Sequence, residues 1–250
     1  LKDSLTFTTA AGAFTNPMFV LSWTVMVIAH ILTVMSMLDY LVKARHLLKG
    51  SAGAKTAKAA APSAAPTEIA ALQKAIDEQA RIVVEKATAA EATVATAESL
   101  TGGLIAAMLT SVPGSSASVR GGIVSYVNEV KAELLGVSED VLARQGAVDE
   151  LVALQMARGA LRELGSDVSV AVTGIAGPAG AEPGKPVGTV YLAGADARTN
   201  TGCLMRLTLG GYRERSVIRA RAAMYALDML RRMALGLPVP DSLAITPDTP

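Results

Sequence analysis

The chain has 250 residues, of which 51% are hydrophobic and 18% charged, and its formal net charge is +1. This length allows one or two domains with a sizeable core, and the basic residues form no aromatic-interleaved patch, so nucleic acid is not expected as the main partner. The single cysteine, Cys203, excludes an internal disulfide and fits a reducing compartment. Both histidines, His30 and His46, lie in the first fifth, so Ser-His-Asp and common zinc sites are excluded after residue 50.

The first apolar segment is an uncharged run of 21 residues from Met18 to Leu38. Roughly 20 such residues cross a bilayer as a helix, whereas the apolar region of a signal peptide usually has only about 7–15. Basic residues from Lys43 onward follow the run, so the positive-inside rule puts the rest of the chain in the cytoplasm. We therefore expect residues 1–49 to be a membrane tail with a transmembrane helix at 18–38. The alternative is a buried helix of a soluble domain. Because the chain begins with Leu1 rather than Met, we also expect it to be part of a longer protein.

Residues 50–66 are a run of Ala, Gly, Ser, Pro and Lys, which cannot bury a core and is typical of a flexible linker. After this run the apolar spacing becomes helical, since Ile69, Leu72, Ile76 and Val83 fall on one face. We expect a helix over about 67–92 that packs on the domain following it.

Strand-like and helical runs then alternate along the chain. Short apolar runs predict strands at Thr93–Ala97, Gly122–Tyr126, Asp167–Thr173, Gly188–Ala193 and Cys203–Leu209. Helical spacing predicts helices at Gly102–Leu109, Glu129–Leu135, Glu139–Arg144, Glu150–Leu164 and Arg213–Arg232. The last two strands follow each other closely, as in an antiparallel hairpin. The sequence thus predicts a three-layer α/β/α domain with a mixed sheet at 67–235, and a Pro-rich disordered tail at 236–250.

The first chemically notable segment is Ala97–Gly103, where a strand runs directly into a helix. Ser99 lies on this turn, and Thr101, Gly102 and Gly103 open the helix. The N-terminus of a helix presents unpaired N–H groups that suit an oxyanion or a phosphate, so Ser99 is a candidate nucleophile. The alternative is that Ser99 or Thr101 only caps the helix.

The second segment follows the next strand and carries Tyr126, Asn128 and Lys131. Asn128 is a candidate helix N-cap, and Lys131 lies one turn into the helix. Without histidine, a serine nucleophile needs another base, and a desolvated lysine of lowered pKa can serve. Lys131 is the best-placed lysine, and the hydroxyl of Tyr126 could assist it. A solvated helix lysine is the alternative.

The third segment is a glycine-rich loop that includes Thr173, Gly174 and Gly177, and its spacing does not match a dinucleotide fingerprint. It is either a plain turn or a loop that approaches a substrate. Arg213, Arg215 and Arg219 lie near the start of the last helix, where positive charge opposes the helix dipole. A bound anion or a solvated arginine face would each account for them.

Together, seven segments resemble the CinA C-terminal domain, the nicotinamide-mononucleotide deamidase family, over about residues 92–232. They are, in order, AESLTGG, VPGSSA, GGIVSYVNEVKAELLGV, QGAVDE, AVTGIAGPAG, KPVGTVY and GGYRERSVIRARA. The resemblance implies hydrolysis of the carboxamide of nicotinamide mononucleotide to nicotinic acid mononucleotide and ammonia, with no required metal or cofactor. It implies that Ser99 is the nucleophile, Lys131 the base and Tyr126 the assisting hydroxyl. It also implies that Thr101, Gly102 and Gly103 form the turn beside the nucleophile, that Thr173, Gly174 and Gly177 line the substrate, and that Arg213 is a candidate phosphate contact. Asn128, which is expected near Tyr126 and Lys131, is a further candidate for substrate binding, and the family commonly forms dimers.

Three residues depart from the family pattern: Leu100 replaces a usual Cys, Asp149 a frequent Ser and Tyr212 a common Asp. We expect Leu100 to fill a pocket-side position. The segment Leu32–Leu41 also resembles the last transmembrane helix of the phosphatidylglycerophosphate synthases, which are CDP-alcohol phosphatidyltransferases. The alternative function is therefore a non-catalytic nucleotide-binding or regulatory domain fused to such a synthase.

Overall fold

The computed structural model describes residues 66–211, 213–240 and 243–245, together with Met26, Val27, His30, Thr33 and Met35. The chain divides into two compact units, Leu1–Ala59 and Ala60–Pro250. Nearly all of the expected transmembrane helix, of the synthase-like segment and of the linker lies outside the described residues, so these stay predictions. In the part that is described, no helix combines the length and the apolar character needed to cross a membrane.

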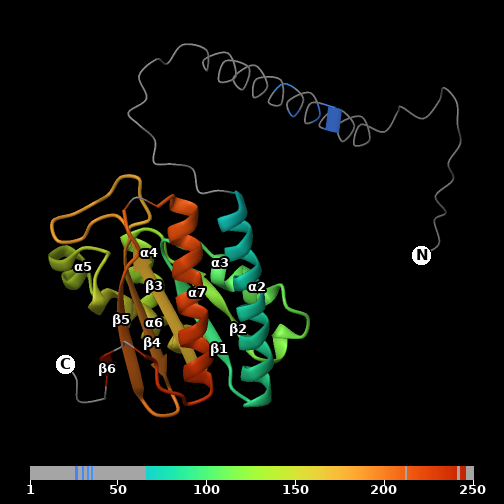
Figure 1. Cartoon of the computed structure of the whole chain (residues 1–250). Helices are drawn as coiled ribbons and strands as arrows, with labels where there is room; N and C mark the ends of the chain where they lie inside the picture. Colours follow the sequence, from blue (N-terminus) through green and yellow to red (C-terminus); the bar gives the residue numbers. More distant parts are fainter. Residues whose placement is uncertain are drawn as a thin grey trace, which may run out of the picture. The chain divides into compact units, whose positions relative to one another are not determined.

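The second unit contains one mixed sheet of six strands in the order β2-β1-β3-β4-β5-β6 (Figure 1). The strands are β1 (Val94–Glu98), β2 (Val119–Val124), β3 (Val168–Gly174), β4 (Thr189–Asp196), β5 (Thr201–Thr208) and β6 (Leu243–Ile245). The helices are α2 (Pro66–Ala89), α3 (Leu104–Thr110), α4 (Asn128–Leu135), α5 (Glu139–Gln145), α6 (Glu150–Leu164) and α7 (Arg215–Ala234), with a 3₁₀ turn η2 (Ser115–Ala117). β1 pairs in parallel with β2 and β3, and the pairs from β3 to β6 are antiparallel.

Alternation along the strands divides the core into two halves, one on each face of the sheet. In β3, Val168, Val170 and Val172 belong to the cluster built with α2, α3 and α7. Ala171 between them belongs to the cluster built with α4, α5 and α6. Because successive side chains of a strand point to opposite faces, each half of the helices covers one face. The predicted three-layer α/β domain with a mixed sheet is confirmed.

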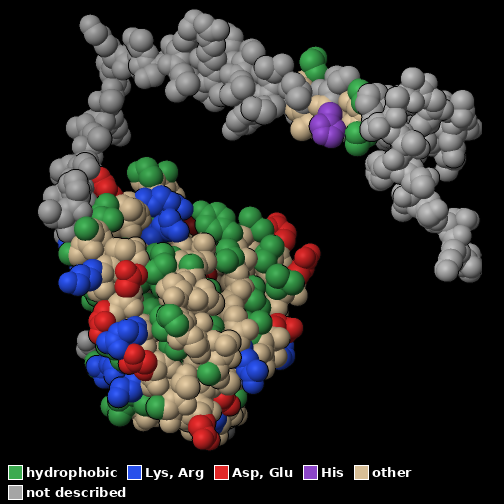
Figure 2. Space-filling view, turned by 90° about the vertical axis from the view of Figure 1, so that its right-hand side faces the viewer, with side chains coloured by type: hydrophobic (Ala, Val, Ile, Leu, Met, Phe, Trp, Pro, Cys, Tyr) green, Lys and Arg blue, Asp and Glu red, His purple; other side chains and the backbone are tan. Residues whose placement is uncertain are grey.

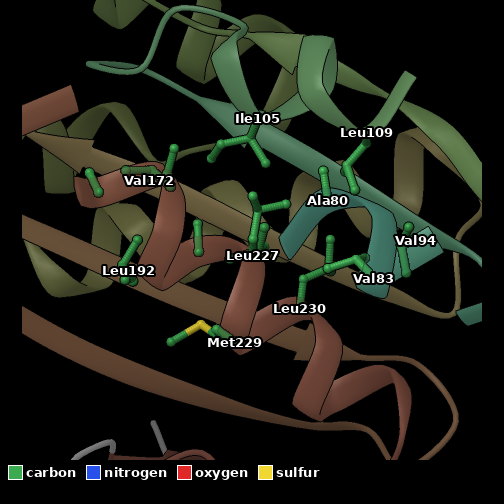
Figure 3. Packing of buried hydrophobic residues seen from close by; sticks show 14 of the residues in the cluster. Ala80, Val83, Val94, Ile105, Leu109, Val172, Leu192, Leu227, Met229 and Leu230 are labelled. Atoms are coloured by element: carbon green, nitrogen blue, oxygen red, sulfur yellow. The ribbon is translucent and has the colours of Figure 1, made fainter. Parts of the chain in front are cut away.

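The larger half of the core is shown in Figure 3. Leu227 of α7 lies at its centre, with Val172 and Leu192 of the sheet on one side and Ala80 and Val83 of α2 on the other. All five side chains are fully buried. Burial of a Val or Leu side chain contributes about 1.5–3 kcal/mol, so the long helices α2 and α7 are held by this shared apolar face.

The sequence placed the five longer strands and the antiparallel β4–β5 hairpin correctly, with ends shifted by a few residues. It missed β6, which pairs with β5 from Leu204↔Leu243 to Gly202↔Ile245. The tail predicted to be disordered from residue 236 therefore includes a short strand. Three residues are too few to give a periodicity, so only the edge of β5 specifies this pairing.

The outer face of α2 carries ion pairs between residues of the same helix. Arg81 lies between Glu78 and Glu85, and all three side chains are about half exposed. In Figure 2 the basic and acidic side chains on this side of the domain are interspersed rather than gathered by sign. Exposed pairs of this kind contribute only about 0.3–0.5 kcal/mol each, so α2 depends mainly on its buried face.

A close approach of backbones joins α4 to α6. Gly159 of α6 is buried against the last turn of α4, and a Cβ added to it would lie 2.1 Å from the carbonyl oxygen of Leu135. No side chain other than hydrogen fits at that distance. This contact fixes the depth of α4 in the domain, and α4 carries Lys131.

Replacement of this glycine tests how strictly the contact sets the helix packing. We expect Gly159→Ala to lower the free energy of unfolding by about 1–3 kcal/mol, because the added methyl forces the two backbones apart. The gain in helix propensity, about 1 kcal/mol, offsets part of this loss. Urea unfolding measures the difference, with Arg158→Ala on the exposed face of the same helix as the control. Equal unfolding midpoints for the two variants would show that the approach of α4 to α6 tolerates an added methyl group.

Candidate active site

The site lies where the three parallel strands end. β1 ends at Glu98, β2 at Val124 and β3 at Gly174, so the segments that follow them meet at one edge of the sheet. From β1 the chain leaves through α3 on one face, and it enters β3 from α6 on the other. Ligands of open α/β sheets bind at such a point, beyond the carboxyl ends of neighbouring strands whose connections diverge.

Ser99 and Lys131 meet at this edge. Ser99 directly follows β1 and is 8% exposed, and its N–H donates to the carbonyl of Val172 in β3. Lys131 in the first turn of α4 is fully buried. Its Nζ lies 3.2 Å from Ser99 Oγ and also donates to the carbonyls of Ser125 (2.8 Å) and Tyr126 (3.1 Å). The predicted serine–lysine pair is thus brought within hydrogen-bond distance.

The surroundings of Lys131 favour its uncharged form. No carboxylate forms an ion pair with its Nζ among the residues that the structure describes. Burial lowers the pKa of Lys131 to about 8, and Glu129, two residues earlier, acts weakly in the opposite direction. A neutral amine has two N–H donors and one lone pair. The two carbonyls can accept the donors, which leaves the lone pair for the hydroxyl proton of Ser99.

The N-terminus of α3 is already occupied by a carboxylate. Glu98 is fully buried, and its two oxygens accept hydrogen bonds from the N–H groups of Ile105 (3.1 Å) and Ala106 (2.8 Å). The expectation that free N–H groups of this helix face a ligand is therefore wrong for its first turn. The physical reason is that an acidic side chain next to a helix N-terminus satisfies its orphan donors itself.

The donors that remain lie in the turn before α3. Gly102 and Gly103 have φ of +62° and +90°, the left-handed region in which glycine is not strained, and they reverse the chain after Ser99. The N–H of Gly102 donates to the carbonyl of Ser99 (3.1 Å). The N–H groups of Leu100, Thr101 and Gly103 donate to no acceptor within the described part of the chain. They are the candidates for an oxyanion hole.

Tyr126 contributes to the site in two ways. Its carbonyl accepts from Lys131, whereas its side chain is 59% exposed and its hydroxyl accepts from Nη2 of Arg215 (3.0 Å). The same guanidinium donates to the carbonyl of Gly177 (2.9 Å). Arg215 thus joins the loop after β2 to the loop after β3. The phenolic proton of Tyr126 stays available for donation, and its catalytic role stays a prediction.

Four other predicted residues lie around this centre with partners of their own. The hydroxyl of Thr173 donates to the carbonyl of Ala147 (2.6 Å), and Gly174 ends β3 against the backbone of β4. Asn128 is exposed and is the first residue of α4, whose N-cap is Val127, so the expected capping role is wrong. Arg213 donates to the carbonyl of Leu209 and pairs with Glu68 of α2 at 3.3 Å. Their roles in binding stay predictions.

The departures from the family pattern that the structure describes leave the centre intact. Leu100 is 3% exposed and belongs to the core cluster of α2, α3 and α7, so the expectation that it fills the pocket is wrong. Asp149 caps α6 by accepting from the N–H of Leu151, and Asp and Ser are equally good caps. Burial raises the pKa of Cys203 to about 11, so this thiol stays protonated and does not compete with Ser99 as a nucleophile.

Comparison with known proteins agrees with this architecture. A profile of the CinA C-terminal domain matches residues 76–234, which is more than half of the chain. The chain belongs to the CinA C-terminal domain family. It is 50% identical over 149 residues to a putative competence-damage inducible protein of Symbiobacterium thermophilum, which covers 58% of this chain and 35% of that one. It is 53% identical over 146 residues to a CinA-like protein of Geobacter sulfurreducens, which covers 57% and 34%.

The crystal structure of the competence/damage inducible protein CihA from Agrobacterium tumefaciens has the same fold. Its TM-score is 0.61 at 43% identity, over 65% of this chain and 96% of that chain. The chain spans about a third of the length of the curated CinA-like relatives it matches. That crystallised relative, by contrast, consists almost entirely of the shared domain.

Sequence reasoning about this CinA domain missed Glu98 next to Ser99, and it missed the loop contacts of Arg215 and Arg219. Glu98 carried a signal, since an acidic residue that ends a buried strand needs a partner nearby. Arg215 and Arg219 were noted only as part of a basic helix start. Their partners are loop carbonyls distant in sequence, which only the fold brings together.

The burial of Lys131 makes the stability of this CinA domain depend on pH. Between pH 8 and 10.5 the unfolded lysine still binds a proton that the folded one has released, so the contribution of Lys131 to stability rises with pH by up to about 3 kcal/mol. The raised pKa of Cys203 acts in the opposite direction above about pH 9, in wild type and variants alike. We expect Lys131→Met to abolish this rise relative to the wild type in urea unfolding across that range. Lys86→Met, at an exposed lysine of α2, is the control and keeps the rise. Parallel profiles for the wild type and Lys131→Met would contradict the burial of a lysine of lowered pKa.

Proposed function

We propose that this domain hydrolyses the carboxamide of nicotinamide mononucleotide and releases nicotinic acid mononucleotide and ammonia. The observation that carries the proposal is the 3.2 Å contact between Ser99 Oγ and the amine of a fully buried Lys131. A serine beside a desolvated lysine is an activated nucleophile suited to acyl transfer. The choice of substrate rests on the resemblance to the deamidase family.

In the acylation step Lys131 takes the proton of Ser99, and Oγ bonds to the carboxamide carbon. The carbonyl oxygen becomes an oxyanion, and its candidate donors are the free N–H groups of Leu100, Thr101 and Gly103 in the nucleophile loop, which comprises residues 99–103. Collapse of this intermediate breaks the C–N bond, and the leaving amine takes the proton from Lys131 and departs as ammonia. One oxyanion donor typically contributes about 10²–10³ in kcat, so the loop is as important as the base.

In the second step water replaces ammonia. Lys131, again neutral, removes a proton from the water, whose oxygen attacks the acyl carbon. The acyl–oxygen bond to Ser99 breaks, Ser99 recovers its proton from Lys131, and the acid is released. The same amine thus acts as base and acid in both steps, which requires a pKa near the operating pH.

The edge of the sheet also offers positive charge for the phosphate of a mononucleotide. Arg215 spans the loops after β2 and β3 and keeps part of its guanidinium at the surface beside the exposed Tyr126. Arginine binds phosphate through two parallel N–H donors, so an incoming phosphate could exchange with the Tyr126 hydroxyl. We therefore add Arg215 to Arg213 as a candidate phosphate contact.

The nucleophile is tested by ammonia release from nicotinamide mononucleotide. We expect Ser99→Ala to lower kcat at least about 10³-fold, because Ser99 supplies the only hydroxyl that contacts the Lys131 amine among the residues that the structure describes. Ser111→Ala, at an exposed serine after α3, is the matched control and keeps the wild-type rate. Ammonia release by Ser99→Ala at the wild-type rate would refute the mechanism. Binding of the nucleotide by the wild type without release of ammonia would favour the alternative of a regulatory domain.

The base is tested by the pH dependence of the rate. Only neutral Lys131 can accept a proton, so kcat/KM should rise with pH through about 8 and then level off. The neutral fraction, and with it the rate, should increase roughly 90-fold between pH 6 and 9. Stopped ammonia assays in constant ionic strength measure the profile. A rate that is flat from pH 6 to 9 would exclude Lys131 as the base.

A further inference from the structure

Arg219 reaches the nucleophile loop from α7. Its Nε donates to the carbonyl of Leu100 (3.0 Å) and its Nη2 to the carbonyl of Thr101 (2.6 Å). The side chain is half-buried, and it forms no ion pair with any carboxylate in the part of the chain that the structure describes. Its guanidinium therefore binds two successive backbone carbonyls next to Ser99 and no acid.

Because the peptide bond is planar, these two contacts also fix the directions of the N–H groups of Thr101 and Gly102. In a trans peptide the C=O of one residue and the N–H of the next point opposite ways. With the Leu100 carbonyl held toward α7, the N–H of Thr101 points away from α7. In the next peptide the Thr101 carbonyl is held likewise, and the Gly102 N–H turns back to the carbonyl of Ser99.

The side to which the Thr101 N–H points is the reacting side. α7 packs on the sheet face shared with α2 and α3, whereas α4, which carries Lys131, belongs to the opposite half of the core. Ser99 Oγ contacts Lys131 and thus lies toward α4. An N–H directed away from α7 therefore points to the side of the sheet on which this hydroxyl lies.

We propose that Arg219 is a positioning residue of the hydrolytic site, which aims the backbone N–H of Thr101 at the oxyanion and polarises it. A cation that binds a carbonyl draws electron density through the peptide group, so the N–H at the other end becomes a stronger donor. Arg219 acts through the peptide and does not touch the substrate. This inference rests on the proposed function: the rate of the hydrolysis would depend on the orientation of the peptide between Leu100 and Thr101.

The test compares Arg219→Met and Arg219→Lys with Arg221→Met in the full chain. Arg221 lies on the same helix, is similarly half-buried and pairs with Glu68. For Arg219→Met we expect kcat for ammonia release to fall about 10- to 100-fold with KM within about twofold, because the Thr101 N–H is no longer held toward the oxyanion in the transition state. The kcat of Arg219→Lys, which keeps the charge but not the planar pair of donors, should fall less. Arg221→Met should retain the wild-type kcat.

A second readout does not require activity. Hydrogen exchange of the Gly102 amide, followed by NMR, should be at least about tenfold faster in Arg219→Met, since its bond to Ser99 depends on the held Thr101 peptide. The rise of the rate with pH through 8 should be unchanged, because Arg219 has no contact with Lys131.

Several results would overturn the inference. They are a kcat of Arg219→Met equal to that of Arg221→Met, a raised KM with unchanged kcat, or unchanged exchange at Gly102. If the wild type releases no ammonia, the proposed function fails, and the Gly102 amide alone decides whether Arg219 positions the loop.

Discussion

The burial of the Lys131 amine is the constraint on which the arrangement of this domain depends. An uncompensated ammonium inside a protein is destabilising, and here two backbone carbonyls and one serine hydroxyl are its only polar contacts among the described residues. To bring the amine to that depth, α4 must lie close to α6, and the contact of Gly159 with the backbone of Leu135 permits this. Burial of the amine therefore lowers the stability of the fold and brings the pKa of Lys131 to about 8, a combination that is common at catalytic sites.

Two charged side chains of opposite sign hold the nucleophile loop from its two ends. Glu98 accepts from the first N–H groups of α3, and Arg219 donates to the carbonyls of Leu100 and Thr101. Glu98 also accepts from the hydroxyl of Thr96 (3.3 Å), whereas both of these bonds of Arg219 go to backbone carbonyls. Glu98 therefore takes the first N–H groups of α3, and the backbone donors left beside Ser99 are those of the loop before the helix.

Much of this could be predicted from the sequence because the signals were local. Strand and helix periodicities gave the layers and five strands, and the absence of histidine pointed to Lys131 as the partner of Ser99. The features that were missed depend on the direction in which a side chain points or on contacts between residues far apart in the sequence. The pattern could not tell that the Leu100 side chain turns into the core, that α4 begins at Asn128 itself, or that β6 pairs with β5. The contacts of Arg219 join positions 118 and 119 residues apart, which no local periodicity encodes.

The same separation sets an order of assembly during synthesis. Ser99 and Lys131 belong to segments that leave the ribosome well before α7, and the nucleophile loop lacks one of its two holders until Arg219 has been made. At about 5–20 residues per second, 119 residues take roughly 6–24 s to translate. A nascent chain therefore carries Ser99 for that interval in an incompletely held loop, and the geometry of the proposed site is completed only when α7 packs on the sheet.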